Sequence, residues 1–392
     1  MRRTCPSGQG QEPLAVAEST NTTAHTPRTA CDYDLAMLPT AIIRQTPEDF
    51  CVEEIPAYEP SGQGEHAIVR FRKTGLTTLD AVRSLARALG VDSRGAGFAG
   101  MKDRHAVTVQ AASFPLARSV DLARAVAAVA LPGIEILDAR RTDHKLKPGH
   151  LRGNRFTITL RGLDAAAVEQ IACDFGALAT RGIPNEFGPQ RFGRDGSNPE
   201  RALAWLRGQA RPPRSRTEQR LLFSAVQSRL FNQVLELRVR DGSWNRVLPG
   251  DLAKKHDTGG LFAVPLEGPE LDDAVRRAEA GGICATGPLF GPRMTWPQGE
   301  VAELERRVLE QTLGPAEGLA PFAPLGQGTR RPLVLRLSEP RTAPEVEGGY
   351  LALGFVLPKG GYATTVLSQL CRPIDAQGQP TSLGEVSEQA DE

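Results

Sequence analysis

Between residues 67 and 110 the spacing of apolar residues changes twice: from the period of a strand to the period of a helix, and then back to that of a strand. Residues 67–73 alternate apolar and basic side chains, which predicts a half-buried strand. Residues 77–80 fit a capping box, and the apolar spacing that follows predicts a helix that Gly90 ends. A second strand is predicted at 106–110. The first strand and the helix therefore deliver the chain to a connection that ends on the second strand.

This connection contains a charged triplet, Lys102, Asp103 and Arg104. A loop that ends on a strand commonly displays reactive side chains. Positive charge on both sides favours the ionised form of Asp103, which suits a nucleophile better than a general acid. Charged residues in a tight connection are also ordinary turn chemistry, and the triplet by itself favours that interpretation.

Gly95, Gly97 and Gly100 precede the triplet and form a literal Gly-x-Gly-x-x-Gly sequence. A dinucleotide-binding loop needs a strand before it and a helix after it, so that the helix N-terminus meets the pyrophosphate. The predicted order is the reverse here, with a helix before and a strand after. We therefore expect these glycines to let the backbone pass close to a neighbouring segment.

The 392 residues are enough for two domains, or for one large domain with an insertion. No apolar run is long enough to span a membrane and the N-terminus lacks a secretory signal, so a cytoplasmic location without a membrane partner is expected. Residues 1–38 predict a disordered N-terminal extension and residues 376–392 a disordered acidic tail. The six cysteines lie far apart, which predicts free thiols in a reducing compartment.

The overall net charge of +1 hides an uneven distribution, because both ends of the chain are net acidic. Residues 140–147 form a basic segment, and six arginines lie within residues 201–220. Such segments either contact RNA phosphates or form a solvated face, and we favour phosphate contact for residues 201–220. His144 and His150 flank a basic loop that contains Lys145 and Lys147, but two histidines alone do not form a metal site, so no metal is predicted.

Residues 153–161 predict another strand, in which Asn154 and Phe156 share a face with Ile158 and Leu160. A core phenylalanine and an asparagine that caps the strand start account for this pattern without any ligand.

Five separated stretches, in the same order along the chain, resemble motifs of the TruD family of tRNA pseudouridine synthases. They are residues 47–54, 100–110, 153–156, 182–193 and 358–367. Residues 182–193, Gly-Ile-Pro-Asn-Glu-Phe-Gly-Pro-Gln-Arg-Phe-Gly, are the most distinctive. Glu186 departs from the usual aromatic residue, and Ser368 and Gln369 replace a customary Arg-Glu pair. The resemblance covers about residues 41–372.

The resemblance implies roles for four of the residues. Asp103 matches the catalytic nucleophile and Arg44 the basic residue that accompanies it. Asn154 matches the asparagine that orients the aspartate and the target nucleotide, and Phe156 the phenylalanine that stacks on the base.

Three further residues complete the predicted substrate contacts. Phe50 matches a phenylalanine that lines the pocket, Tyr362 matches the aromatic residue that closes it, and Lys102 adjoins the nucleophile. The target base must leave the stack to reach such a pocket. The reaction moves the glycosidic bond from uracil N1 to C5 and needs no redox or energy cofactor, so no cofactor is predicted. The sequence leaves open whether Asp103 attacks C6 or C1′.

The fold implied by the resemblance is α+β. Residues 39–181 and 343–375 would form a pseudouridine-synthase-like catalytic domain with a mixed β-sheet, and residues 182–342 an inserted TruD-specific α/β domain. The implied substrate is tRNA, at uridine 13 of the D-arm. A monomer without a protein partner is expected.

Two other classes of protein stay open. One is a non-catalytic tRNA-binding protein of the same fold, against which intact Asp103, Asn154 and Phe156 argue. The other is a phosphotransferase with an aspartate nucleophile. Such enzymes hold magnesium with a second aspartate two residues on, where this chain has His105.

Overall fold

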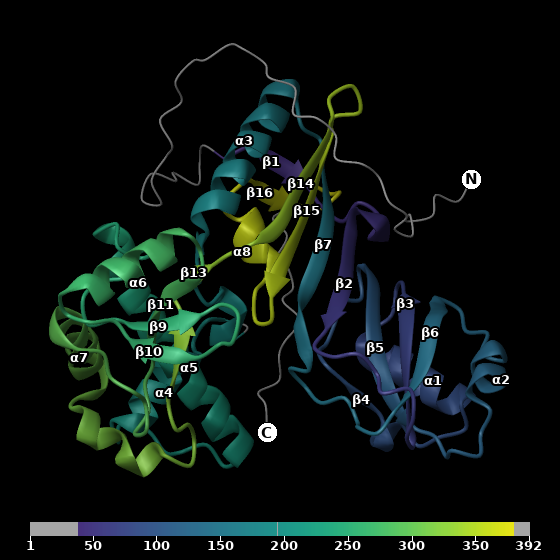
Figure 1. Cartoon of the computed structure of the whole chain (residues 1–392), viewed down its shortest axis with the longest axis horizontal. Coiled ribbons are helices and arrows are strands. Elements are labelled where there is room, and N and C mark those ends of the chain that lie inside the picture. Colours follow the sequence, from purple (N-terminus) through teal and green to yellow (C-terminus); the bar gives the residue numbers. More distant parts are fainter. Residues whose placement is uncertain (1–37, 194, 380–392) are drawn as a thin grey trace.

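The computed structural model describes residues 38–193 and 195–379. Ten strands of this part form one mixed sheet, seven of them in the order β14-β15-β7-β2-β5-β3-β6 (Figure 1). The ten are β1 (Thr40–Ile42), β2 (Phe50–Pro56), β3 (His66–Lys73), β4 (Gly97–Phe98), β5 (Val107–Pro115), β6 (Ile134–Thr142), β7 (Leu151–Arg161), β14 (Ser338–Glu345), β15 (Tyr350–Pro358) and β16 (Arg372–Ile374). Strands from both halves of the chain therefore share one sheet.

The predicted strand and helix before the charged triplet are confirmed. Strand β3 buries Val69 and Phe71 and leaves the arginines between and after them partly exposed. Helix α1 (Thr78–Ala88) begins at the capping box, where Thr77 Oγ1 accepts a hydrogen bond of 3.1 Å from the Asp80 N–H. The predicted close approach is confirmed at Gly97, because a Cβ there would lie 2.1 Å from the Leu146 carbonyl oxygen.

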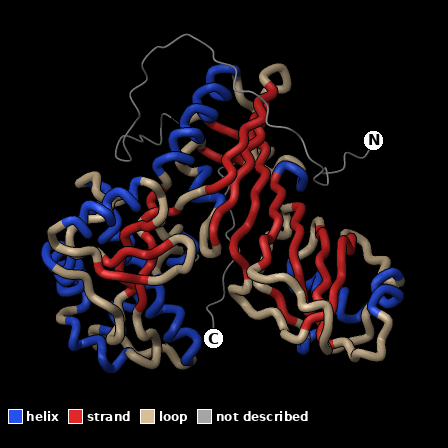
Figure 2. The backbone as a smooth tube through the Cα atoms, in the orientation of Figure 1, coloured by secondary structure: helices blue, strands red, loops and turns tan. Residues whose placement is uncertain are grey.

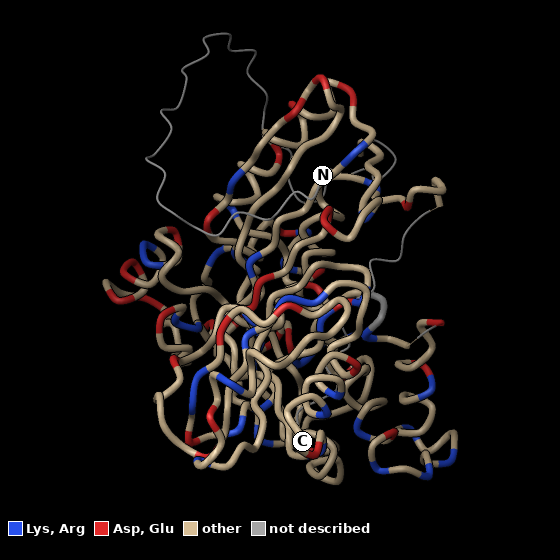
Figure 3. Tube along the Cα trace, turned by 90° about the vertical axis from the view of Figure 1, so that its right-hand side faces the viewer, with Lys and Arg blue, Asp and Glu red and all other residues tan. Residues whose placement is uncertain are grey.

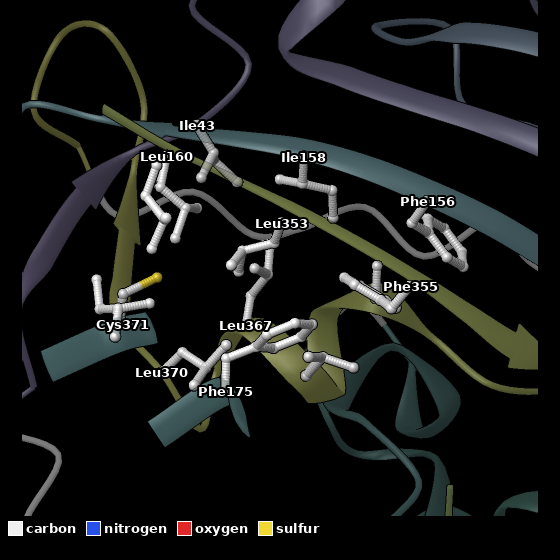
Figure 4. Close-up of a cluster of buried hydrophobic side chains, with 14 of the residues drawn as sticks. Ile43, Phe156, Ile158, Leu160, Phe175, Leu353, Phe355, Leu367, Leu370 and Cys371 are labelled. Carbon is white, nitrogen blue, oxygen red and sulfur yellow. The ribbon is translucent and has the colours of Figure 1, made fainter. Parts of the chain in front are cut away.

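Helices cover one face of the large sheet. They include α1, α3 (Ala165–Arg181) and α8 (Ala363–Leu367), while α2 (Leu122–Ala127) contacts β6. Phe156 of β7 and Phe355 of β15 pack toward Phe175 of α3 and Leu367 of α8 (Figure 4). The alternation of β7 thus directs Phe156, Ile158 and Leu160 into the core, as predicted.

The chain leaves the large sheet after α3 and returns to it at β14. Strands β8 (Ile183–Pro184) and β13 (Val334–Leu335) pair where it leaves and returns. Between them lie α4 (Asn198–Leu206), α5 (Arg216–Arg240), β9 (Leu252–Lys255), β10 (Leu261–Ala263), α6 (Pro269–Glu279), β11 (Ile283–Leu289), α7 (Gly299–Leu313) and β12 (Thr329–Pro332). The four strands β9 to β12 form a smaller sheet in the order β10-β9-β11-β12 among helices (Figure 2). The α+β fold is confirmed, whereas the exact domain limits stay a prediction.

The open face of the large sheet is polar. Arg70 and Arg155 both pair with Glu53, and Arg155 also pairs with Glu339, so the four charges link β3, β2, β7 and β14. Basic and acidic residues are interspersed over the trace in the view of Figure 3. Each helix of the described chain is too short or too polar to cross a bilayer.

Candidate active site

Side chains from several separated parts of the chain line one pocket of about 90 Å³. The pocket lies against β2 and β7, between the loop that precedes β5 and the turn that follows β15. All seven predicted site residues line it: Arg44, Phe50, Lys102, Asp103, Asn154, Phe156 and Tyr362. The structure thus brings them together, and their individual roles stay predictions.

Asp103 lies in the short loop between β4 and β5. Its Oδ2 is 2.7 Å from an Arg44 Nη2 atom, and its Oδ1 accepts a hydrogen bond of 2.9 Å from the His105 N–H. The expectation that the two sequence neighbours supply the positive charge is wrong. Lys102 pairs with Glu54, and the Arg104 guanidinium donates to the Gly75 carbonyl oxygen. The cation that contacts the Asp103 carboxylate is the guanidinium of Arg44, which is distant in sequence.

Arg44 has a left-handed backbone with φ of +56°. This region is uncommon for a residue with a side chain and persists where the surroundings hold it. The guanidinium lies 4.4 Å from the centre of the Phe50 ring and pairs with Asp103. Burial lowers the pKa of Arg44, and the Asp103 carboxylate partly offsets that effect. Arg44 is therefore a confined cation, directed at one carboxylate.

Lys102 and Glu54 form a buried ion pair of 2.9 Å, with 6% and 4% of their side chains exposed. The Lys102 backbone N–H donates a hydrogen bond of 2.8 Å to the Thr78 hydroxyl, which in turn donates to Gln110 Oε1. Since Thr78 begins α1 and Gln110 lies in β5, the start of the helix and the sheet both hold the loop before Asp103. Glu54, Thr78 and Gln110 were not predicted as site residues.

Lys73 is a further residue that the motif pattern missed. It ends β3, is fully buried, and donates hydrogen bonds to the carbonyl oxygens of Leu76 (2.8 Å) and Asp103 (2.7 Å). Burial lowers its pKa to about 8. The period of two could have found it, because Lys73 continues the buried face of Val69 and Phe71.

Two phenylalanine rings form the apolar wall of the pocket. Phe50 and Phe156 meet edge to face, with ring centres 6.3 Å apart, and Phe156 stacks on Phe355 at 5.4 Å. One ring face of Phe156 is therefore already occupied. Tyr362 approaches from the turn after β15 and lines the same pocket.

The side-chain oxygen of Asn154 is buried without a hydrogen-bond partner in the described structure. An unpaired buried oxygen is unfavourable by about 1–3 kcal/mol. Asn154 lines the pocket, so a donor on a bound ligand would satisfy the oxygen.

At least two of the six arginines in residues 201–220 make contacts within the protein. Arg201 pairs with Glu218 at 2.9 Å, and Arg207 donates to the Thr312 carbonyl oxygen. Both contacts are within the protein, so RNA binding by these arginines stays a prediction. No group of three or more His, Cys, Asp or Glu side chains in the described ranges is placed to hold a metal ion.

The fold resembles a crystal structure of a Methanosarcina mazei protein described as tRNA pseudouridine synthase D. The TM-score is 0.72 at 24% identity, over 88% of this chain and 96% of that one. At this identity the likeness shows that the two proteins share a fold.

Sequence comparisons define the class of the protein as a pseudouridine synthase, which is an isomerase, and identify its family. A model of the tRNA pseudouridine synthase D (TruD) family matches residues 39–201 and 214–370. A tRNA pseudouridine synthase D of Anaeromyxobacter dehalogenans strain 2CP-1 is 47% identical over 340 residues, which covers 84% of this chain and 92% of that protein. One from Thermus thermophilus is 40% identical over 331 residues, covering 84% and 88%. The chain belongs to the TruD family of tRNA pseudouridine synthases.

Proposed function

We propose that this protein converts uridine 13 in the D-arm of tRNA to pseudouridine, with Asp103 as the nucleophile and the target base flipped out of the RNA stack. The observation that carries the proposal is the 2.7 Å ion pair between Asp103 and Arg44 in a pocket with an aromatic wall. A carboxylate held next to a fixed cation is ready to attack an electrophilic carbon of a bound nucleotide.

The reaction is an isomerisation, so atoms and electrons balance within the nucleotide and solvent protons. The bond between ribose C1′ and uracil N1 breaks, a bond between C1′ and C5 forms, C5 loses its hydrogen as a proton and N1 gains one. Asp103 would attack either C1′ or C6. The proposal needs no redox or energy cofactor.

The pocket favours a base that has left the stack. Phe50, Lys102 and Phe156 of its lining are buried, so a base inside an RNA helix would not reach the floor of the pocket. Phe50, Phe156 and Tyr362 are the candidates for holding the base. Stacking on an aromatic side chain contributes about 1–3 kcal/mol per base, which helps to offset the loss of stacking in the RNA.

The proposal is tested by incubating the purified protein with unmodified bulk tRNA and mapping pseudouridine with carbodiimide. A new mark at position 13 of the D-arm is expected. A protein that binds tRNA but leaves no mark would be a non-catalytic tRNA-binding protein, and the enzymatic proposal would fail.

Replacing Asn154 by alanine is expected to lower kcat/KM by roughly 10- to 100-fold, because the substrate loses a buried hydrogen-bond partner. Thr157→Ala is the matched control, since Thr157 is exposed on the same strand and points to the opposite face. Single-turnover rates of both variants at saturating tRNA, together with their KM values, provide the measurement. Equal rates for Asn154→Ala and the control would exclude this role for Asn154.

We also propose a cytoplasmic monomer in which residues 182–342 act as a separate tRNA-binding domain. The features that support a separate tRNA-binding domain are the four-stranded sheet in that segment and its arginines near α4 and α5. Arg211 and Arg214 lie in the exposed connection between these helices and are the candidates for phosphate contact.

A further inference from the structure

Lys73 is a fully buried cation for which the proposed reaction assigns no role. It is the last residue of β3 and lies opposite Thr108 of β5 and Ile134 of β6 in the sheet register. Lysine is almost never fully buried unless its ammonium group has partners. The complete burial of Lys73 therefore needs an explanation.

The partners of Lys73 are two backbone carbonyl oxygens. One belongs to Leu76, in the turn before α1, and the other to Asp103 itself. The distances of 2.8 and 2.7 Å are those of charge-assisted hydrogen bonds. The ammonium thus joins the end of β3 to the peptide group of the nucleophile.

The charged side chains around Lys73 are paired with groups other than its ammonium. From the loop before β5 the Asp103 carboxylate attracts the ammonium and Lys102 repels it, and Lys102 is neutralised by Glu54 of β2. The Asp103 carboxylate is in turn paired with Arg44.

Two other charged groups near Lys73 face elsewhere. Arg104 donates to the Gly75 carbonyl oxygen. Arg72, the preceding residue of β3, pairs with Glu135 on the opposite face of the sheet. Lys73 therefore contacts the backbone carbonyl oxygen of Asp103, while Arg44 contacts its carboxylate.

We propose that Lys73 is a positioning residue whose protonated side chain holds the Asp103 peptide, so that the carboxylate stays directed into the pocket. The inference rests on the proposed role of Asp103 as the nucleophile. Lys73 contacts neither the substrate nor the reacting atoms, and its effect passes through the loop.

The proposal predicts that the contribution of Lys73 to the reaction rate depends on pH, because only the protonated amine carries a charge. The pKa of Lys73 is lowered by burial to about 8, so the group is protonated below that pH and neutral above it in the folded protein. A neutral amine donates weaker hydrogen bonds to the two carbonyl oxygens than an ammonium does. The contribution of Lys73 to catalysis is therefore present below pH 8 and is lost as the pH rises through it.

The test compares single-turnover rates of wild type and Lys73→Met at pH 7 and pH 9.5 with saturating tRNA. The wild type is expected to be at least tenfold faster at pH 7, and this ratio should fall toward one at pH 9.5. Titration of the tRNA affects both proteins equally and cancels in the ratio. KM for tRNA should change less than twofold, and Arg72→Met, the same change on the opposite face of β3, should match wild type at both pH values.

A role confined to folding predicts a lower Tm with the same rate ratio at both pH values, and that result would overturn the proposal. So would a ratio near one at pH 7. If Lys73→Met does not fold, Lys73→Arg decides instead, because arginine keeps its charge at both pH values. The Lys73→Arg variant should then lose less activity than wild type between pH 7 and pH 9.5, and an equal loss would contradict the proposal. A wild-type protein that forms no pseudouridine would instead refute the proposed function.

Discussion

Replacing Asp103 by asparagine is expected to lower the rate of pseudouridine formation by at least about 10⁴-fold, which is the scale of losing an enzyme nucleophile. The amide has nearly the same size and can still accept the hydrogen bond from the His105 N–H, so the loop should keep its conformation. It carries no negative charge and cannot form the covalent bond to the nucleotide. Kd for tRNA should stay within threefold of wild type, as measured by filter binding.

The matched control for this variant is Asp92→Asn. Asp92 is more exposed, pairs with Arg94 before the glycine run, and lies outside the pocket. It undergoes the same loss of charge and should retain wild-type activity. More than 1% residual activity in Asp103→Asn would mean that another group attacks the nucleotide.

Replacing Lys102 by methionine is expected to destabilise the catalytic part of the chain by about 3–5 kcal/mol, the usual effect of removing one partner of a buried ion pair. The change leaves the Glu54 carboxylate buried without its cation. Hydrogen exchange in peptides that span β2 and β5 measures the effect locally, because protection there follows the free energy of opening.

The inserted segment provides an internal control for the Lys102 variant. Trp205, Trp244 and Trp296 all lie within residues 182–342, so tryptophan fluorescence reports on that segment alone. Its unfolding midpoint should not change. Adding Glu54→Leu to Lys102→Met should restore most of the protection in β2 and β5, since it removes the unpaired charge. If the single variant exchanges as slowly as wild type, the ion pair does not stabilise this part of the fold.

The sequence was sufficient to predict elements whose pattern is local. Strands β3 and β7 follow from alternation, and the start of α1 follows from its capping box. The motifs also identified seven residues that line one pocket, although they are spread from Arg44 to Tyr362. Each of these signals lies within a few adjacent residues, which is why a single sequence contains it.

Contacts between distant segments could not be predicted in the same way. The cation beside Asp103 was expected from its neighbours, but the tight loop turns Lys102 and Arg104 toward Glu54 and Gly75. Arg44 reaches Asp103 because β2 pairs in parallel with β5, and that register involves residues more than fifty positions apart. The buried carbonyl contacts of Lys73 likewise depend on how the loop folds over the end of β3.

The basic segments show a second limit of sequence reasoning. Six arginines in residues 201–220 are predicted to contact RNA, and two of them, Arg201 and Arg207, also have partners within the protein. Composition counts charges but does not separate those used in folding from those available to a ligand. Arg211 and Arg214 are exposed and are the main candidates for contact with RNA.

The central claim is that the Asp103 pocket moves the glycosidic bond of uridine 13 to C5. Release of tritium from tRNA labelled with [5-³H]uridine measures this directly, because the new bond at C5 expels that hydrogen. We predict release of one equivalent per tRNA by wild type and no release from a transcript with cytidine at position 13. Absence of release by wild type, or equal release from the cytidine 13 transcript, would contradict the account.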